Sequence, residues 1–213
     1  PSPIPLAINT YGSEKRMAMV LGRDTVEDAA AELNKLVKAK PPTSLGETFK
    51  LLGTALDLRH AKPKHVSDGP CKEVVHRFQE PKDTSQNPPT LLNLPIQQCW
   101  PQDAGRFLTL PCVVTHDPDT GDRNLGLYRM QVFDEQTTAL HWQLQKVAAR
   151  HGRRYYEKGE RMPVSVFLGG DPVYAFCASA PLPDGLDELL LAGWLRQKCV
   201  PLVKCETNDL EVP

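Results

Sequence analysis

The segment DPDTGDRNLGLYRMQV, residues 117–132, carries side chains that could do chemistry. In an extended strand, successive side chains point to opposite faces. One face would then carry Leu127, Arg129 and Gln131, and the other Tyr128, Met130 and Val132. An arginine and a glutamine on one face could line a polar pocket. The alternative is an edge strand with one solvated face, and the residues alone leave both interpretations open.

A second candidate is FLGGDP, residues 167–172, where two glycines stand between an expected strand and a helix start. Backbone N–H groups in such a turn could hold a phosphate. A tight turn into a well-capped helix is the simpler interpretation and the one we favour. The chain contains none of the glycine-rich nucleotide-binding, zinc-protease or nucleophile-elbow motifs.

The first ~65 residues are expected to be mostly helical. Residues 5–12 predict a short buried strand and a turn. Ser13 then caps a helix over 14–21 that Gly22 closes. Thr25 and Asp28 resemble a capping box for the next helix. Its apolar stripe is Ala29, Leu33, Leu36 and Val37.

Two prolines, Pro41 and Pro42, would break that second helix. Ser44 and Glu47 repeat the capping-box spacing and predict a third helix. Its apolar stripe is Phe49, Leu52, Ala55 and Leu56.

The pattern changes after a loop over 81–95 that is rich in Pro, Asn, Ser and Thr. Two strand-like runs follow, over 106–115 and 127–133. The turn residues of 117–122 separate them, which predicts a hairpin.

Further elements are expected toward the end of the chain. Residues 142–157 predict a helix, with Leu144, Val147, Ala148, His151 and Tyr155 on one face. Residues 162–170 predict a buried strand, and Asp171 before a proline predicts a helix start. Asp184 is expected to cap a further helix, and residues 200–207 predict a closing strand. The stripe of that helix is Leu186, Leu189, Leu190, Gly193 and Trp194.

Composition narrows the class of protein. The 213 residues include 25 Lys and Arg against 26 Asp and Glu, a balance that argues against nucleic acid or an anionic membrane as the main partner. No apolar run reaches membrane-spanning length, and no leader is seen, so we expect a cytoplasmic protein. No C-x-x-C pair occurs, so reduced and mostly buried thiols are expected. The six cysteines are Cys71, Cys99, Cys112, Cys177, Cys199 and Cys205.

Five segments, in order, resemble successive motifs of the UbiD family of prenylated-FMN-dependent decarboxylases, which includes 3-polyprenyl-4-hydroxybenzoate decarboxylase. They are INTYGSEKRMAMVLG, WPQDAGRFLTLPCVVTHDPDTGDRNLGLYRMQV, MPVSVFLGGDP, APLPDGLDELLLAGWLR and VKCETNDLEVP. The resemblance implies an α+β fold. Residues 67–213 would form a split β-barrel like that of flavin reductases, and residues 1–66 the C-terminal part of an N-terminal α/β domain.

The resemblance also implies roles for residues. Leu127, Tyr128 and Arg129 match flavin-contacting residues, and Arg129 matches the arginine of the family's catalytic Glu-Arg-Glu network. Further matches to cofactor-contacting positions are His141, Trp142, Gln143, Lys146 and Val147. Asn124 and Glu188 match ligands of a divalent metal, usually Mn²⁺ and often joined by K⁺. Glu188 has an alternative interpretation, as an acid placed in a first helical turn by the helix dipole.

Two departures from the family pattern matter. Many relatives carry a metal-ligating His at the position of Gln145, whose amide offers an oxygen but no imidazole nitrogen. The family's catalytic acids and its C-terminal domain lie past the position of Pro213. We therefore expect a fragment that is inactive alone, from a protein that forms homo-oligomers and receives its cofactor from a flavin prenyltransferase.

The implied reaction is reversible, non-oxidative decarboxylation of an aromatic or α,β-unsaturated acid. Hydroxybenzoates, polyprenyl hydroxybenzoates, naphthoates of menaquinone synthesis and cinnamates all remain open as substrates. Two alternatives belong to other classes: a flavin-binding accessory module without decarboxylase activity, and an FMN-dependent reductase that uses NAD(P)H. The extended motifs and the lack of a nicotinamide signal count against the reductase.

Overall fold

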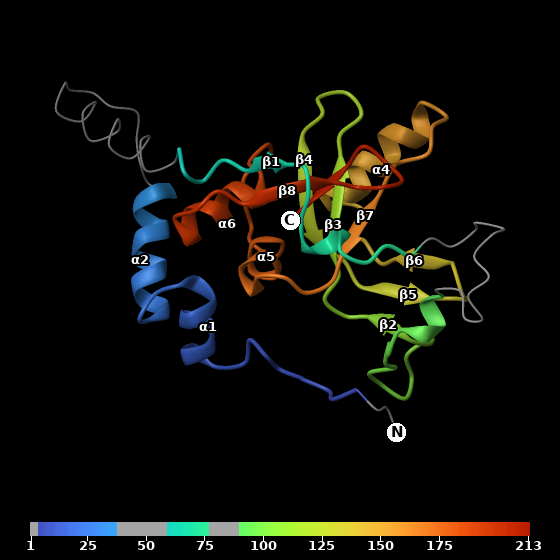
Figure 1. Cartoon of the computed structure of the whole chain (residues 1–213), viewed down its shortest axis with the longest axis horizontal. Coiled ribbons are helices and arrows are strands. Elements are labelled where there is room, and N and C mark those ends of the chain that lie inside the picture. Colours follow the sequence, from blue (N-terminus) through green and yellow to red (C-terminus); the bar gives the residue numbers. More distant parts are fainter. Residues whose placement is uncertain (1–3, 38–58, 77–89) are drawn as a thin grey trace. The chain divides into compact units, whose positions relative to one another are not determined.

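The computed structural model of the chain describes residues 4–37, 59–76 and 90–213. They group into two compact units. The strand unit is formed mainly by residues 66–169 and 203–212, and the helix unit mainly by residues 6–65 and 170–202. The expected domain boundary at residues 66 and 67 stays a prediction. The elements labelled in Figure 1 make up a mixed α/β fold with small sheets.

One sheet of the strand unit is built around β3, Cys112–His116, which pairs antiparallel with β4, Arg123–Leu127, and with β7, Ser165–Phe167. A hairpin therefore forms across the predicted turn, but its second strand is residues 123–127 rather than 127–133. Its turn is held by Asp117, whose Oδ1 accepts the N–H of Asp119 at 2.9 Å. Short polar side chains commonly satisfy turn N–H groups in this way, which explains the sequence DPDTGD.

A second sheet has the order β2–β5–β6, with β2 at Phe107–Leu108, β5 at Met130–Val132 and β6 at Thr138–Leu140. The single strands expected over 106–115 and 127–133 are wrong, because each run is divided between the two sheets. Pro111, which has no N–H to give to a ladder, lies in the first break. No closed barrel is seen among the residues described, and the split barrel stays a prediction.

Helix α4, Val147–Glu157, packs against β3 and β4. Its expected start at residue 142 is wrong by five residues, and Leu144 is 79% exposed rather than on the buried face. The loop before α4 makes a hydrogen bond outside the helix, because the His141 N–H donates to the Arg129 carbonyl at 2.9 Å. The apolar face of α4 contributes Ala148 to a core cluster with Val113, Tyr128 and Met130.

In the helix unit, α1 spans Glu14–Leu21 and α2 spans Val26–Val37. As predicted, Ser13 caps α1 through the N–H of Arg16, and Gly22 closes it in the left-handed conformation. Thr25 accepts the N–H of Asp28, but it returns its hydroxyl to the Asp28 carboxylate, so only half of a capping box forms. The third helix, predicted from Ser44 and Glu47, lies outside the described residues.

Helix α5, Pro172–Cys177, begins as predicted, with Asp171 accepting the N–H of Val173 at 2.9 Å. The Arg196 guanidinium binds the same carboxylate through two contacts of 2.6 and 2.7 Å. The two glycines before Asp171 thus form a tight turn into a capped helix. This agrees with the simpler of the two interpretations of FLGGDP.

Helix α6 spans Glu188–Arg196. Its predicted cap, Asp184, is wrong: Asp187 caps it by accepting the N–H of Leu189 at 2.8 Å. Gly193 is explained by packing, because a Cβ built there would lie 2.3 Å from the Ala61 carbonyl oxygen. Only glycine allows this close approach of two backbones.

The remaining elements are short. They are β1 at Lys64–Val66, β8 at Pro201–Lys204, β9 at Glu211–Val212, and 3-10 turns at Pro70–Lys72 and Leu91–Asn93. The closing strand is confirmed as β8, which pairs antiparallel with β9. The strand expected within residues 5–12 is wrong, since no strand is formed there and Ile8 is 72% exposed. The expected turn is present, because the Gly12 N–H donates to the Asn9 carbonyl at 3.0 Å.

The six cysteines are free thiols, as expected, but only Cys112 and Cys177 are buried. Within the parts of the chain that the structure describes, no helix is long and apolar enough to cross a membrane.

Candidate functional site

The arginine that the sequence singles out is held by a carboxylate. Arg129 Nη1 and Nη2 donate to the two carboxylate oxygens of Asp103 at 3.1 and 2.7 Å. The hydrogen bond from Arg129 holds the pKa of Asp103 below its ordinary value. The same bond is the main reason that the pKa of Arg129 is raised. Both groups are therefore charged at neutral pH, in a bidentate pair of fixed geometry.

An aromatic ring lies under the same guanidinium. The Arg129 Cζ is 3.9 Å from the centroid of the Phe107 ring, a cation–π contact. Phe107 pairs across the sheet with Gln131, so Arg129, Phe107 and Gln131 share one face of β2 and β5. Gln131 Nε2 donates to the Ala104 carbonyl at 3.2 Å. The expected grouping of Arg129 with Gln131 is therefore present, and both side chains bind the loop before β2.

The neighbouring residues of the expected cofactor strand take different positions. Tyr128 is buried, and its ring makes an edge-on contact with Trp142 at a centroid distance of 6.3 Å. Gly126 makes room for Tyr128, because a Cβ there would lie 2.2 Å from the tyrosine ring. Leu127, the last residue of β4, is half-buried. The sequence NLGLYR thus places Tyr128 in the core and Arg129 at its edge.

The second and third expected cofactor stretches form the loop that leads into α4. His141, Gln143 and Lys146 are exposed, whereas Trp142 and Val147 are half-buried. Hydrogen bonding between His141 and Arg129 brings the loop beside the NLGLYR segment. Lys146 precedes α4 without a side-chain cap for its first turn. A lysine at an uncapped helix start suits an anionic group such as a phosphate.

The three expected metal ligands belong to different parts of the molecule. Asn124 lies on β4 and is buried, with its Nδ2 3.5 Å from the Tyr128 hydroxyl. Gln145 is exposed and donates its Nε2 to Gln143 Oε1 at 2.8 Å. Both amides thereby direct their nitrogens to protein partners, which leaves the carbonyl oxygens as the ligand atoms a hard cation prefers. Glu188 is the first residue of α6, in the helix unit.

Convergence of Asn124, Gln145 and Glu188 on one ion stays a prediction. No cluster of three His, Cys, Asp or Glu side chains able to hold a metal occurs within residues 4–37, 59–76 and 90–213. The expected ligand set has two amides and one carboxylate, so it is not a cluster of three such side chains.

A second polar group lies behind the hairpin. Asp117 and His151 are buried, and His151 Nε2 is 3.7 Å from Asp117 Oδ2. His151 Nδ1 lies 3.0 Å from the Thr115 hydroxyl, and Arg154 pairs with the Asp117 carboxylate. Burial lowers the pKa of His151. Burial also raises the pKa of Asp117, but the N–H groups of Asp119 and Thr120 and the charge of Arg154 outweigh it and hold that pKa below its ordinary value.

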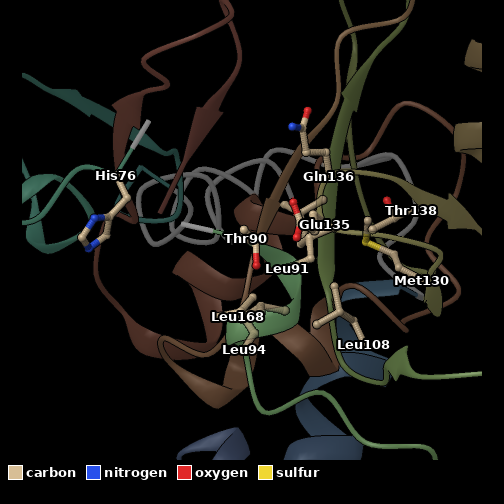
Figure 2. A pocket seen from close by; sticks show the side chains of 11 residues that line it. His76, Thr90, Leu91, Leu94, Leu108, Met130, Glu135, Gln136, Thr138 and Leu168 are labelled. Carbon is tan, nitrogen blue, oxygen red and sulfur yellow. The ribbon is translucent and has the colours of Figure 1, made fainter. Parts of the chain in front are cut away.

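The strand unit also contains an open apolar pocket of about 660 Å³ (Figure 2). Its lining includes Leu91, Leu94, Leu108, Met130 and Leu168. Leu108 and Met130 pair across β2 and β5, on the face opposite Phe107 and Gln131. The pocket and the Arg129 guanidinium therefore lie on opposite faces of this sheet.

Two residues of the Arg129 site were missed by the sequence analysis. Asp103 and Phe107 both lie in the quoted motif WPQDAGRFLTLP, but no role was assigned to either. Nothing in the spacing connects position 103 with position 129. The only local signal was the turn composition of residues 100–105, which indicates a fixed loop but not its partner.

Comparison with known proteins covers most of this chain. Residues 64–213 match the family model for UbiD, the 3-octaprenyl-4-hydroxybenzoate carboxy-lyase Rift-related domain. An uncharacterized protein of Archaeoglobus fulgidus is 40% identical over 211 residues, and one of Aquifex aeolicus is 40% identical over 210. Each match covers 99% of this chain but only 41% of the relative. The chain thus spans about two fifths of their length.

Solved structures of UbiD-class enzymes share the fold. HmfF from Pelotomaculum thermopropionicum, in complex with FMN, is 26% identical with a TM-score of 0.72, over 95% of this chain and 39% of HmfF. Vanillic acid decarboxylase of Sedimentibacter hydroxybenzoicus, in its closed form, is 24% identical with a TM-score of 0.71, over 96% of this chain and 40% of that enzyme. The family match and the shared fold agree, and the chain belongs to the UbiD family.

Proposed function

We propose that the protein catalyses reversible, non-oxidative decarboxylation of an aromatic or α,β-unsaturated carboxylic acid. The observation that carries this proposal is Arg129, fixed by Asp103 and Phe107 at the expected position in a UbiD-family chain. A planar guanidinium is the side chain best suited to bidentate recognition of a carboxylate. The related vanillic acid decarboxylase, which shares the fold, supports an aromatic acid as substrate.

The proposed cofactor is prenylated FMN. HmfF is known both with FMN and, in an evolved dimeric form, with prenylated FMN. In this chain, the cofactor would contact the NLGLYR segment and the loop over 141–147. Lys146 and the start of α4 offer positive charge for its phosphate. When bound, prenylated FMN supplies an electrophilic ring that accepts the electron pair left by departing CO₂.

Arg129 would hold the substrate carboxylate in line for C–C bond cleavage. It would not deliver the proton that completes the reaction, because guanidinium groups stay protonated at any ordinary pH. Asp103 would not deliver it either, since its pKa is lowered by Arg129 and it is ionised at neutral pH. We infer that the acid lies elsewhere in the full-length protein, and that the 213-residue chain alone does not turn over.

The proposed metal is Mn²⁺, with K⁺ as a second cation. Asn124, Gln145 and Glu188 would supply its protein ligands. Glu188→Ala should lower both the metal content and the flavin retained by the intact protein, whereas Glu160→Ala, which removes an exposed acid, is the matched control. Unchanged metal and flavin in Glu188→Ala would count against this ligand set.

The remaining parts of the proposal concern architecture and partners. We propose that residues 67–213 form a split β-barrel in the intact protein, and that the protein is a homo-oligomer supplied by a flavin prenyltransferase. The dimeric form of HmfF supports an oligomer of defined size.

The direct test follows CO₂ release from a panel of aromatic and unsaturated acids. The intact protein is loaded with prenylated FMN or with plain FMN, and the 213-residue chain is assayed in parallel. Turnover is expected only for the intact protein with prenylated FMN. Oxidation of NAD(P)H with plain FMN would instead indicate a reductase. Binding of the flavin without either reaction would indicate an accessory module.

A further inference from the structure

Asp103 is itself held rigidly. Its Oδ2 accepts the backbone N–H of Trp100 at 3.1 Å, and its own N–H donates to the Trp100 carbonyl at 3.1 Å. Gln98 Nε2 donates to the Trp100 and Asp103 carbonyls at 3.2 and 3.1 Å. The Asp103 side chain is 13% exposed. This carboxylate is therefore a fixed anchor rather than a mobile surface acid.

The anchor and the ring together fix the guanidinium in three dimensions. Asp103 binds the end-on edge, formed by Nη1 and Nη2, and so sets the direction of the group within its plane. Phe107, 3.9 Å from Cζ, sets the plane itself. A guanidinium has a second bidentate edge, formed by Nε and one Nη. The Cys99 thiol is a further hydrogen-bonding partner of the same guanidinium. A substrate carboxylate would bind the N–H groups that Asp103 and Cys99 leave.

The charge of Asp103 also limits what its role can be. Its negative charge offsets that of Arg129, so it weakens the long-range attraction of a substrate anion. If Arg129 acted only through its charge, then Asp103 would be a hindrance, and Asp103→Asn would tighten substrate binding. If Arg129 acts through directed N–H groups, then the loss of Asp103 would let the guanidinium rotate.

We propose that Asp103, together with Phe107, is a positioning residue for Arg129, and that it directs the guanidinium toward the carboxylate of the substrate. The inference rests on the proposed function, because it assumes a carboxylate substrate. Asp103 acts through Arg129 and does not touch the reacting carbon. The Arg129–Asp103 pair is formed within the protein itself. Preorganisation of this kind reduces the reorientation of the guanidinium that the reaction would need.

The test uses the intact protein loaded with prenylated FMN, in wild-type form and as Asp103→Asn and Phe107→Leu. Glu211→Gln is the matched control, because it disrupts another partly buried Arg–acid pair of the strand unit, Arg123–Glu211 at 3.3 Å. Four quantities are measured: kcat, KM, the flavin content, and the rate at which phenylglyoxal modifies Arg129, which is followed by peptide mass spectrometry.

Asp103→Asn is expected to lower kcat by about 10- to 100-fold, the range for a misplaced catalytic group, with a smaller change in KM and normal flavin content. Arg129 should react several times faster with phenylglyoxal, because its end-on edge is released. Phe107→Leu keeps the ion pair and should show a smaller fall in kcat, so the inference stays testable if Asp103→Asn does not fold. Glu211→Gln should match the wild type in kcat and in Arg129 modification.

Two failures can be told apart. A wild type without turnover on any acid overturns the proposed function and this inference together. An active wild type overturns the inference alone if Asp103→Asn keeps its kcat within about twofold, binds substrate more tightly, or leaves the Arg129 modification rate unchanged.

Discussion

Two arginine–aspartate pairs of the strand unit use the same chemistry in different surroundings. Arg154 pairs with Asp117, whose carboxylate is buried and also accepts the N–H of Asp119 in the hairpin turn. Arg129 pairs with Asp103 at the edge of β5, over the Phe107 ring. Both carboxylates accept N–H groups of their own loops and bind an arginine far along the chain. They differ in that Arg154 belongs to helix α4, which packs on the hairpin, whereas Arg129 lies among the residues expected to contact the cofactor. Removal of Asp117 should therefore affect folding, and removal of Asp103 should affect orientation.

The largest expected effect is on kcat/KM, when Arg129 and Arg154 are each replaced by alanine. Arg129→Ala should lower kcat/KM by about 10² to 10³-fold, the usual loss when one positioned donor is removed, with little change in stability. Arg154→Ala should leave kcat/KM near the wild-type value and lower stability by about 1 kcal/mol. Steady-state assays and urea unfolding of the intact protein measure both. If Arg154→Ala lost as much activity as Arg129→Ala, the assignment of separate roles would fail.

The next effect concerns the buried carboxylate. Asp117→Ala removes the acceptor for two turn N–H groups and the partner of Arg154, so unfolding should become easier by about 2 kcal/mol. Amide hydrogen exchange across β3 and β4 should accelerate, with no comparable change across α1. Asp122→Ala, in the same turn but more exposed, is the control. Unaltered exchange in Asp117→Ala would mean that the turn does not depend on this side chain.

The smallest effect is a pH dependence. The pKa of His151 is lowered chiefly by burial, so the folded protein resists protonation. Below the ordinary histidine pKa of about 6.5, the unfolded state takes up a proton that the folded state does not, and stability falls until the folded pKa is reached. His151→Gln should remove this dependence below pH 6.5, while the loss from Asp117, whose pKa is lowered, occurs only at lower pH. Urea unfolding of both proteins at several pH values measures it, and equal slopes would contradict the assignment.

The sequence predicted what local chemistry determines. The cap at Ser13, the turn over 117–122 and the start of α5 at Asp171 all form as expected, because each depends on residues within three or four positions. The cap at Asp184 failed because Asp187 offers an equivalent carboxylate three residues later, two positions before the buried Leu189.

The elements that failed depend on pairing partners far along the chain. Strand periodicity runs unbroken through residues 127–133, but β4 pairs with β3 and β5 with β2, so the ladder changes sheets near Tyr128. For the same reason, Arg129 could be singled out while Asp103, 26 positions earlier, could not. The roles of the flavin- and metal-binding residues came from family resemblance alone and stay predictions.

The central claim is that this chain serves prenylated-flavin chemistry, and the mass of the flavin bound to the intact protein tests it most directly. The protein is produced together with a flavin prenyltransferase, and the released cofactor is examined by mass spectrometry. We expect the mass of the prenyl adduct in the wild type. Plain FMN alone, in a protein produced with an active prenyltransferase, would contradict the account.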